Sequence, residues 1–295
     1  MLVALGAMLL AVFGVSVVAF GDAGSDPARL PLGDGKVTTA GPKKGYVYVC
    51  RTSNAPAGAF RDGPWIRSDG TFDLTSKAVV DGSVSWPGQV TFKTSGASIA
   101  VSGNGLPAGG ASTGVFPIAP SDDAYQYDRN PNSVAARSVS YTLPATPRLA
   151  SRPTCLTGGP IGIAKNGVAI FNALDANDRD AVAHETQDAC GGHPQQSGVY
   201  HYHSIPSCLT DGEATNRPSG LVGYALDGIP IYGPRGEGGK LVTNDDLDAC
   251  HGRTSWVTFN GKRVRIYHYQ ATLEYPYTVG CFRATPVSGA VGGPG

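Results

Sequence analysis

An internal repeat constrains the fold of this chain more than any other feature of its sequence. Residues 161–171 (IGIAKNGVAIF) match residues 222–232 (VGYALDGIPIY) position for position. Three further elements then follow in the same order in both copies: Asp-Ala-Cys at 188–190 and 248–250, Tyr-His-Tyr at 200–202 and 267–269, and a closing cysteine at 208 and 281. Four matched elements in one order predict two copies of one structural unit, at about 161–210 and 222–283.

Each copy opens with a predicted β-hairpin. Asn166-Gly167 and Asp227-Gly228 lie between apolar runs, and such pairs favour tight hairpin turns because both turn residues need positive φ. Asn260-Gly261 predicts a third hairpin, whose second strand carries the second Tyr-His-Tyr. One short helix is expected within residues 178–189, which contain neither Gly nor Pro.

The rest of the chain predicts short strands. Forty-one glycines and 22 prolines interrupt the 295 residues, and short alternating segments lie between these turns at 46–50, 84–86, 99–102 and 139–143. The expected fold class is mainly β, with sandwich- or barrel-like sheets built from short hairpins, an internally duplicated C-terminal half and one short helix.

The ends of the chain indicate export. Residues 2–20 are apolar and uncharged, as in a signal peptide or an N-terminal anchor, here placed at 1–23. We expect a mobile linker at 24–44, an N-terminal β region at 45–155, the duplicated region at 156–285 and a flexible tail at 286–295. The protein would then be secreted or periplasmic, or tethered to the membrane by its N-terminus.

Six cysteines in an exported chain predict disulfides. Each copy of the repeat carries one cysteine before its Tyr-His-Tyr strand and one after it. The predicted pairs are therefore Cys190–Cys208 and Cys250–Cys281, which leaves Cys50–Cys155.

The candidate chemistry lies in the histidines, all six of which fall between residues 184 and 268. Strand residues i and i+2 share a face, so His201 and His203 project together and could bind one metal ion. The alternative is a pair of half-exposed strand histidines. His268 holds the equivalent place in the second copy and would approach the same centre if the copies pack about a twofold axis. His193 follows Cys190 and is expected as a ligand or as a neighbour of the ligands.

Other polar residues are expected near this centre without binding the metal: Gln270, His184 and Asp188. The segment 184–188 (HETQD) resembles the start of a zinc-protease helix, but Asp188 stands where the second histidine should be. A local His184–Asp188 pair, one helical turn apart, is favoured over catalysis. His251 aligns with Gly191 and is expected at the surface.

Several of these segments resemble a known family. Residues 188–194 (DACGGHP), 200–203 (YHYH), 223–233 (GYALDGIPIYG) and 275–282 (YPYTVGCF) together resemble the bacterial YHYH-domain proteins, over about residues 46–282. The resemblance implies an exported protein and brings no established activity. In that family the second block usually also reads YHYH, whereas Gln270 replaces its last histidine here.

Two classes of function follow. The first is an exported, disulfide-bonded protein with a His-rich site for zinc or copper, and with the three imidazoles and open position of a metalloenzyme. The second is a surface binding or adhesion module in which Trp65, Trp86 and Trp256 stack on a glycan and the histidines are structural. Its partner would be a small molecule or glycan. The 23 basic and 23 acidic residues balance, which argues against nucleic acid or anionic membranes.

Overall fold

The computed structural model describes residues 26–53, 55, 58–209 and 215–288. The expected signal peptide at 1–23 and most of the expected tail at 286–295 lie outside these ranges. Within them, no helix is both long enough and apolar enough to cross a membrane.

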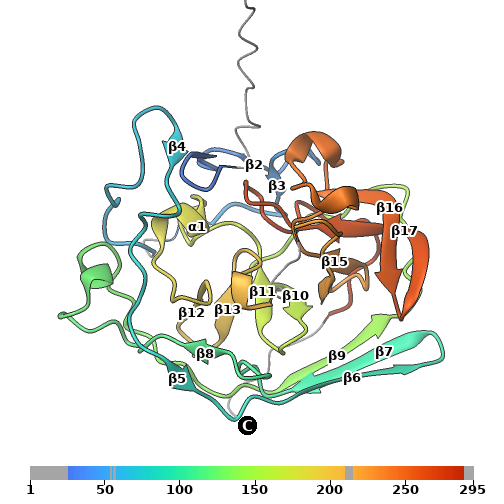
Figure 1. Ribbon diagram of the computed structural model, residues 1–295, viewed down its shortest axis with the longest axis horizontal. Coiled ribbons are helices and arrows are strands. Elements are labelled where there is room, and N and C mark those ends of the chain that lie inside the picture. The colour runs from blue at the N-terminus through green and yellow to red at the C-terminus, as the bar shows by residue number, and fades with distance from the viewer. Residues whose placement is uncertain (1–25, 54, 56–57, 210–214, 289–295) are drawn as a thin grey trace, which may run out of the picture.

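The centre of the molecule is an eight-stranded sheet built by the duplicated region (Figure 1). Its strand order is β12-β13-β11-β10-β14-β15-β17-β16, so both halves have the same order outward from the β10–β14 pair. The strands are β10 (Pro160–Ala164), β11 (Ala169–Phe171), β12 (Gly192–Pro194), β13 (Tyr200–Tyr202), β14 (Leu221–Ala225), β15 (Pro230–Tyr232), β16 (Gly252–Phe259) and β17 (Lys262–Gln270).

The junction between the halves explains two glycines of the repeat. Strands β10 and β14 pair antiparallel, with Ile163 opposite Tyr224. A Cβ atom on Gly162 would lie 2.8 Å from the Tyr224 carbonyl oxygen, and one on Gly223 would lie 2.5 Å from that of Ile163. A side chain at either position would force the two strands apart, so the close approach requires glycine.

The three predicted hairpins are confirmed. Gly167 lies at φ 85° between β10 and β11, and Gly228 at φ 81° between β14 and β15. Asn260 and Gly261 take φ 50° and 72° in the turn between β16 and β17. Glycine adopts this left-handed conformation at low cost. Both residues of the pair are left-handed only at Asn260-Gly261; Asn166 and Asp227 do not take the expected positive φ.

Smaller sheets surround the central one. They are β1 (Leu30–Pro31) with β4 (Thr71–Phe72), β2 (Val37–Thr38) with β3 (Val47–Tyr48), β5 (Val84–Ser85) with β8 (Ser112–Thr113), and β6 (Val90–Ser95) with β7 (Ser98–Gly103) and β9 (Val139–Pro144). The one α-helix of the described residues is α1 (Ala181–His184), beside the 3-10 turns η1 (Asp123–Gln126), η2 (Ser207–Leu209), η3 (Glu237–Gly239) and η4 (Asn244–Asp246). The predicted mainly β fold with one short helix is confirmed, and the described sheets are open rather than closed into a barrel.

One apolar core runs through the N-terminal and the duplicated regions. It includes Leu30, Phe72 and Leu143 from the first and Ile163 and Val279 from the second. The boundary expected at 155 therefore does not separate two cores.

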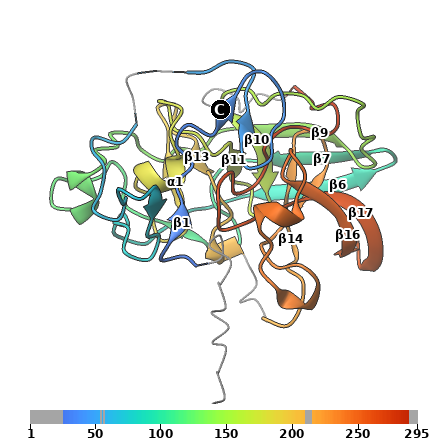
Figure 2. The ribbon, with the colours of Figure 1, turned by 90° about the horizontal axis from the view of Figure 1, so that it is seen from above.

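Residues 26–44 do not form the expected linker. Leu30 is fully buried, and the Gly33 amide donates to Asp180 Oδ2 over 2.9 Å, which fixes this segment against the stretch that leads into α1 (Figure 2). The single buried side chain of Leu30 anchors this Gly- and Pro-containing segment to the apolar core.

All three predicted disulfides are present. Cys50–Cys155, Cys190–Cys208 and Cys250–Cys281 have Cα–Cα distances of 4.9, 5.6 and 4.5 Å, within the usual range. No cysteine among the described residues is free. Such disulfide use is typical of extracellular and periplasmic proteins.

Candidate metal centre

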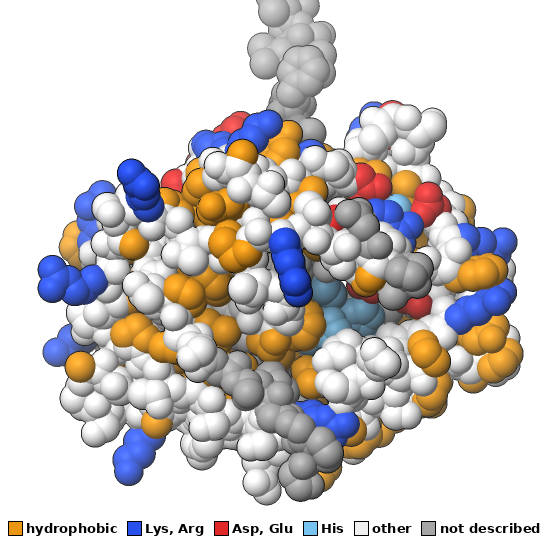
Figure 3. Space-filling model, turned by 180° about the vertical axis from the view of Figure 1, so that it is seen from behind, with side chains coloured by type: hydrophobic (Ala, Val, Ile, Leu, Met, Phe, Trp, Pro, Cys, Tyr) orange, Lys and Arg blue, Asp and Glu red, His pale blue; other side chains and the backbone are white. Residues whose placement is uncertain are grey.

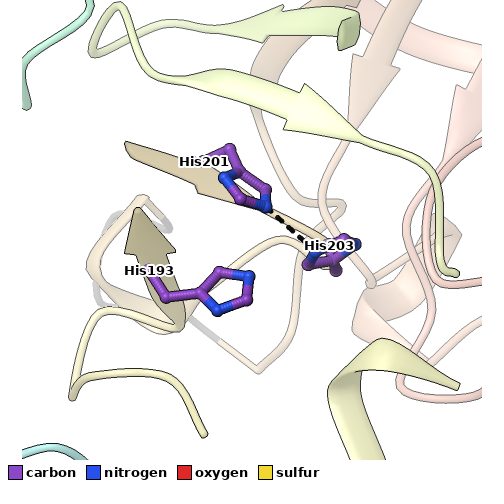
Figure 4. A group of neighbouring side chains, drawn as sticks. All are labelled: His193, His201 and His203. Atoms are coloured by element: carbon purple, nitrogen blue, oxygen red, sulfur yellow. Dashed lines mark hydrogen bonds between the residues drawn. The ribbon is translucent and has the colours of Figure 1, made fainter. Parts of the chain in front are cut away.

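Three histidines from two neighbouring strands converge. His193 on β12 lies directly opposite His201 on β13, and His203 follows β13 on the same face as His201. One ring nitrogen from each histidine lies within 4.8 Å of the others, and all three residues are buried. Figure 4 shows the rings pointing toward one another. We call these residues the His triad.

The strands around the triad hold its rings in place. Strand β11 runs parallel to β13, and its Phe171 ring stacks on the His201 ring with the centroids 4.0 Å apart. The tyrosines that alternate with these histidines point the other way: Tyr200 donates to Asp188 Oδ2 over 2.8 Å, and Tyr202 accepts from Asn166 Nδ2 over 3.0 Å. The Tyr-His-Tyr-His pattern thus gives β13 one face for histidines and one buried face for hydrogen-bonded tyrosines.

Backbone carbonyls decide which ring nitrogens carry protons. His201 Nδ1 lies 3.1 Å from the Val199 oxygen, and His203 Nδ1 lies 2.5 Å from the Asn172 oxygen. A carbonyl only accepts, so both Nδ1 atoms donate and both Nε2 atoms of the neutral rings carry lone pairs. These two Nε2 atoms lie 3.1 Å apart (Figure 4). Two lone pairs at this distance repel unless a proton or a metal ion lies between them.

Burial disfavours the proton. It lowers the pKa of His203 to about 4. Burial, followed by the neighbouring imidazoles, also holds the pKa values of His193 and His201 well below the ordinary value. At neutral pH the rings are therefore neutral, which is the form that binds metal ions.

His193 completes the donor set. Neither of its ring nitrogens has a hydrogen-bond partner, although both are buried. An unpaired buried imidazole costs free energy, and a metal ion shared with His201 and His203 would remove that cost. The residues present therefore fit a metal ion.

Glu185 is a functional candidate that the sequence analysis missed. It directly follows α1, and its Oε2 lies 3.6 Å from His193 Nε2 and 3.5 Å from His203 Nε2. This oxygen is buried without a hydrogen-bond partner. Burial, then the nearby Asp128 and Asp175 carboxylates, raise its pKa well above the ordinary value. The available signal was the His-Glu pair at 184–185.

His184 and Asp188 do not form the expected local pair, because α1 ends at His184 and helical spacing does not continue to Asp188. His184 Nδ1 lies 2.9 Å from Asp62 Oδ1, and its Nε2 lies 2.9 Å from Asp34 Oδ2. Burial lowers its pKa, but these carboxylates raise it more, so the net shift is upward. His184 thus fixes α1 to the N-terminal segments and does not contact the His triad.

Asp188 shapes the turn that leads into β12. Its carboxylate accepts from the amides of Gly114, Cys190 and Gly192 and from the Tyr200 hydroxyl. It therefore positions His193 through the backbone rather than through direct contact.

His268 does not join the triad. Strands β11, β10, β14 and β15 separate β13 from β17, which places the two Tyr-His-Tyr strands roughly 24 Å apart at the usual strand spacing. The two copies lie side by side in one sheet instead of facing each other. For that reason the expected centre shared by both copies is not formed.

The second copy repeats the triad's geometry with different side chains. His268 Nδ1 lies 3.1 Å from the Ile266 oxygen, and its Nε2 lies 3.1 Å from Gln270 Oε1. The Gln270 amide donates to the Gly233 carbonyl, in the place where His203 donates to Asn172. Arg253 lies opposite His268 where His193 lies opposite His201. A guanidinium and an amide thus replace two imidazoles, and this second place is unsuited to a metal cation.

His251, expected at the surface, is buried. Its Nε2 lies 3.0 Å from Thr272 Oγ1, and burial lowers its pKa to about 3. Its backbone has φ 69°, the same value as Gly191 in the first copy. The two copies share this turn geometry, which in the second copy directs the His251 side chain into the protein interior.

A cavity of about 1240 Å³ opens onto the His triad. Its walls include Phe60, Phe171, Arg129 and Glu185. On the face opposite to that of Figure 1, histidine side chains are visible at the bottom of a hollow (Figure 3). A small molecule entering from solvent would therefore meet the imidazoles.

Of the three tryptophans expected to stack on a glycan, Trp256 is the exposed one. Trp65 is buried and donates to the Ala183 carbonyl, and Trp86 is half-buried and donates to Thr113 Oγ1.

The part of the chain that holds the triad is similar to a known protein family. Residues 140–240 match the sequence model of the YHYH protein family. This part of the chain is a YHYH domain. No curated protein and no solved structure matches the chain. The YHYH domain contains Glu185 and the whole His triad, whereas Arg253, His268 and Gln270 lie beyond the matched residues.

Proposed function

We propose that the YHYH domain binds one divalent transition-metal ion through His193, His201 and His203. The observation that carries this proposal is the 3.1 Å contact between His201 Nε2 and His203 Nε2, in rings whose Nδ1 atoms both face backbone carbonyls. A metal ion between these atoms would turn a repulsion into two bonds. The carbonyls would then act as the outer partners that orient metal-ligating histidines.

Zinc and copper are the metals that the donor set favours. Imidazole nitrogens suit both ions, and three histidines with one remaining position form the layout of catalytic zinc sites. The cavity beside the triad leaves room at that position for water or a substrate.

Glu185 supports an enzymatic role for this centre. A metal ion at such a site supplies Lewis acidity to a bound water or carbonyl oxygen. Glu185 Oε2, held within 3.6 Å of two triad nitrogens, is placed to take up and return a proton at that position. Its raised pKa brings this exchange closer to neutral pH. We infer a metalloenzyme acting on a small molecule that enters the cavity.

The export of the protein is part of the proposal. Three disulfides support an oxidising compartment, with residues 1–23 as a signal peptide or membrane anchor. There the protein would be secreted or periplasmic.

Spectroscopy of the copper-loaded protein tests the proposal. Untagged, metal-stripped protein is titrated with Cu²⁺, and electron paramagnetic resonance reports the coordinating nitrogens. We expect coupling to three imidazole nitrogens and a change in the spectrum when azide is added. His268→Ala serves as the control and should give the same spectrum. Absence of nitrogen coupling would refute the metal site, and a spectrum unaffected by azide would refute the open position.

A further inference from the structure

The hairpin formed by β16 and β17 carries a charge unlike that of the rest of the chain. Residues 252–270 contain four basic side chains and no Asp or Glu, whereas the whole chain carries 23 of each sign. The basic residues are Arg253, Lys262, Arg263 and Arg265. This local excess of positive charge would attract an anionic partner.

One face of the hairpin combines this charge with an aromatic ring. Trp256 lies opposite Arg265, and Thr258 lies opposite Arg263, so these four side chains share a face. The Arg263 guanidinium carbon lies 4.5 Å from the centroid of the Trp256 ring. Trp256 is 41% exposed. We call Trp256, Arg263 and Arg265 the hairpin platform.

The platform already contacts a carboxylate from within the chain. Arg263 Nη2 lies 3.6 Å from Glu237 Oε1, and both side chains are more than half exposed. An exposed ion pair of this kind is weak, so a ligand carboxylate could replace Glu237. Strand β16 forms the edge of the central sheet, and the hairpin lies at the periphery of the molecule in both ribbon views (Figures 1 and 2). A polymer could therefore lie along it.

We propose that the hairpin platform binds an acidic polysaccharide built from hexuronic acid residues. The apolar face of one sugar ring would stack on Trp256, and carboxylates of neighbouring sugars would pair with Arg263 and Arg265. Two residues apart on one strand face, these arginines are spaced by about 7 Å, and guanidinium forms bidentate pairs with carboxylate. This surface lies outside the YHYH domain and does not depend on the metal centre.

A polysaccharide fits this surface better than other anions. The three disulfides favour an exported protein, which would meet surface polysaccharides rather than cytoplasmic nucleic acid. Insertion into a membrane needs several exposed apolar side chains, whereas the face that holds Trp256 also carries Thr258 and two arginines.

Binding of polygalacturonate to the full chain tests this proposal. Titration is followed by calorimetry and by intrinsic tryptophan fluorescence, with Trp256→Ala identifying the contribution of Trp256. We expect Trp256→Ala and the double variant Arg263→Gln/Arg265→Gln each to weaken binding at least tenfold. Arg148→Gln/Arg152→Gln removes the same charge at exposed positions elsewhere and should change affinity less than twofold.

Wild-type protein gives a second, independent readout. Methyl-esterified polygalacturonate has the same sugar rings without the charges, and it should not bind. Metal-stripped protein should bind polygalacturonate as tightly as metal-loaded protein, so this test can succeed or fail separately from the metal site. Equal losses in the Arg148/Arg152 control, full affinity in Trp256→Ala, or platform-dependent binding to anionic vesicles but not to polygalacturonate would each overturn the proposal.

Discussion

Arg253 lies directly opposite His268 in the ladder between β16 and β17. In the first copy the corresponding ladder position pairs His193 with His201. In each copy the histidine Nδ1 donates to the carbonyl two residues earlier, from His201 to Val199 and from His268 to Ile266, so the two copies differ at this place mainly in the surrounding side chains. Arg253 holds a fixed positive charge where the triad offers a third imidazole.

Restoring histidines in the second copy should therefore create a second metal site. The variant Arg253→His/Gln270→His places three imidazoles at the positions of the triad, and we expect it to bind about two equivalents of zinc by inductively coupled plasma mass spectrometry. Gln270→His alone should bind one equivalent with unchanged affinity, since roughly 24 Å separates it from the triad. A single equivalent in the double variant would show that side-chain replacement does not explain the difference between the copies.

Glu185 should tune the metal site. Glu185→Gln keeps the size of the side chain but removes the ionisable carboxyl group beside His193 and His203, whose negative form a bound cation would favour. We expect metal affinity to fall about 10- to 100-fold, the usual effect of losing a partner close to metal ligands. Competition with a chromogenic chelator measures this. Glu237→Gln, an exposed position near no metal ligand, is the matched control, and an equal affinity in both variants would contradict the role given to Glu185.

Asp188 and Asp248 form a matched pair for stability. Each accepts from two backbone amides in its own turn and from a tyrosine hydroxyl. Asp188 is buried, whereas the Asp248 side chain is 41% exposed. Asp188→Asn should therefore lower the free energy of unfolding by about 1–3 kcal/mol, and Asp248→Asn by less. Urea denaturation compares them, and the reverse order would contradict the burial argument.

His251 should make the folded protein sensitive to acid. The pKa of His251 is about 3 in the folded protein and 6.5 in the unfolded chain. As the pH is lowered, the unfolded chain binds the proton first, so the folded protein becomes less stable as the pH decreases from about 6.5 toward 3. Asn accepts a positive φ, so His251→Asn suits the left-handed backbone here and does not titrate. The gap in unfolding free energy between wild type and this variant should shrink by about 2 kcal/mol from pH 7 to pH 5.

The measurement is urea denaturation of both metal-free proteins at the two pH values. Taking the difference between them cancels the opposite effect of Asp180 and Asp227, whose pKa values are raised by burial to about 6. A gap that does not change with pH would mean that His251 is not held as a buried neutral ring.

Local patterns in the sequence predicted much of this structure. Asn166-Gly167, Asp227-Gly228 and Asn260-Gly261 located three hairpins because turn chemistry acts within a few residues. The period of two along a strand placed His201 and His203 on one face. The order of cysteines within each copy predicted two disulfides and left Cys50–Cys155 as the third.

The remaining features depend on how distant segments pack. His268 was expected beside His201 because the sequence does not show whether two copies of a unit face each other or lie in one sheet. Glu185 reaches the triad only because α1 ends at His184, and that end is fixed by contacts with Asp34 and Asp62. Leu30 anchors a segment whose composition is that of a linker, because one buried apolar side chain is invisible to average composition.

The central claim is that the His triad holds one metal ion. The most direct test is the metal content of untagged protein, purified, reconstituted with zinc and dialysed, for wild type, His201→Ala/His203→Ala and His268→Ala. We expect close to one zinc per chain in the wild type and in His268→Ala, and close to none in His201→Ala/His203→Ala with the fold retained by circular dichroism. A wild-type protein without bound zinc or copper after reconstitution, or equal metal content in all three proteins, would contradict the account.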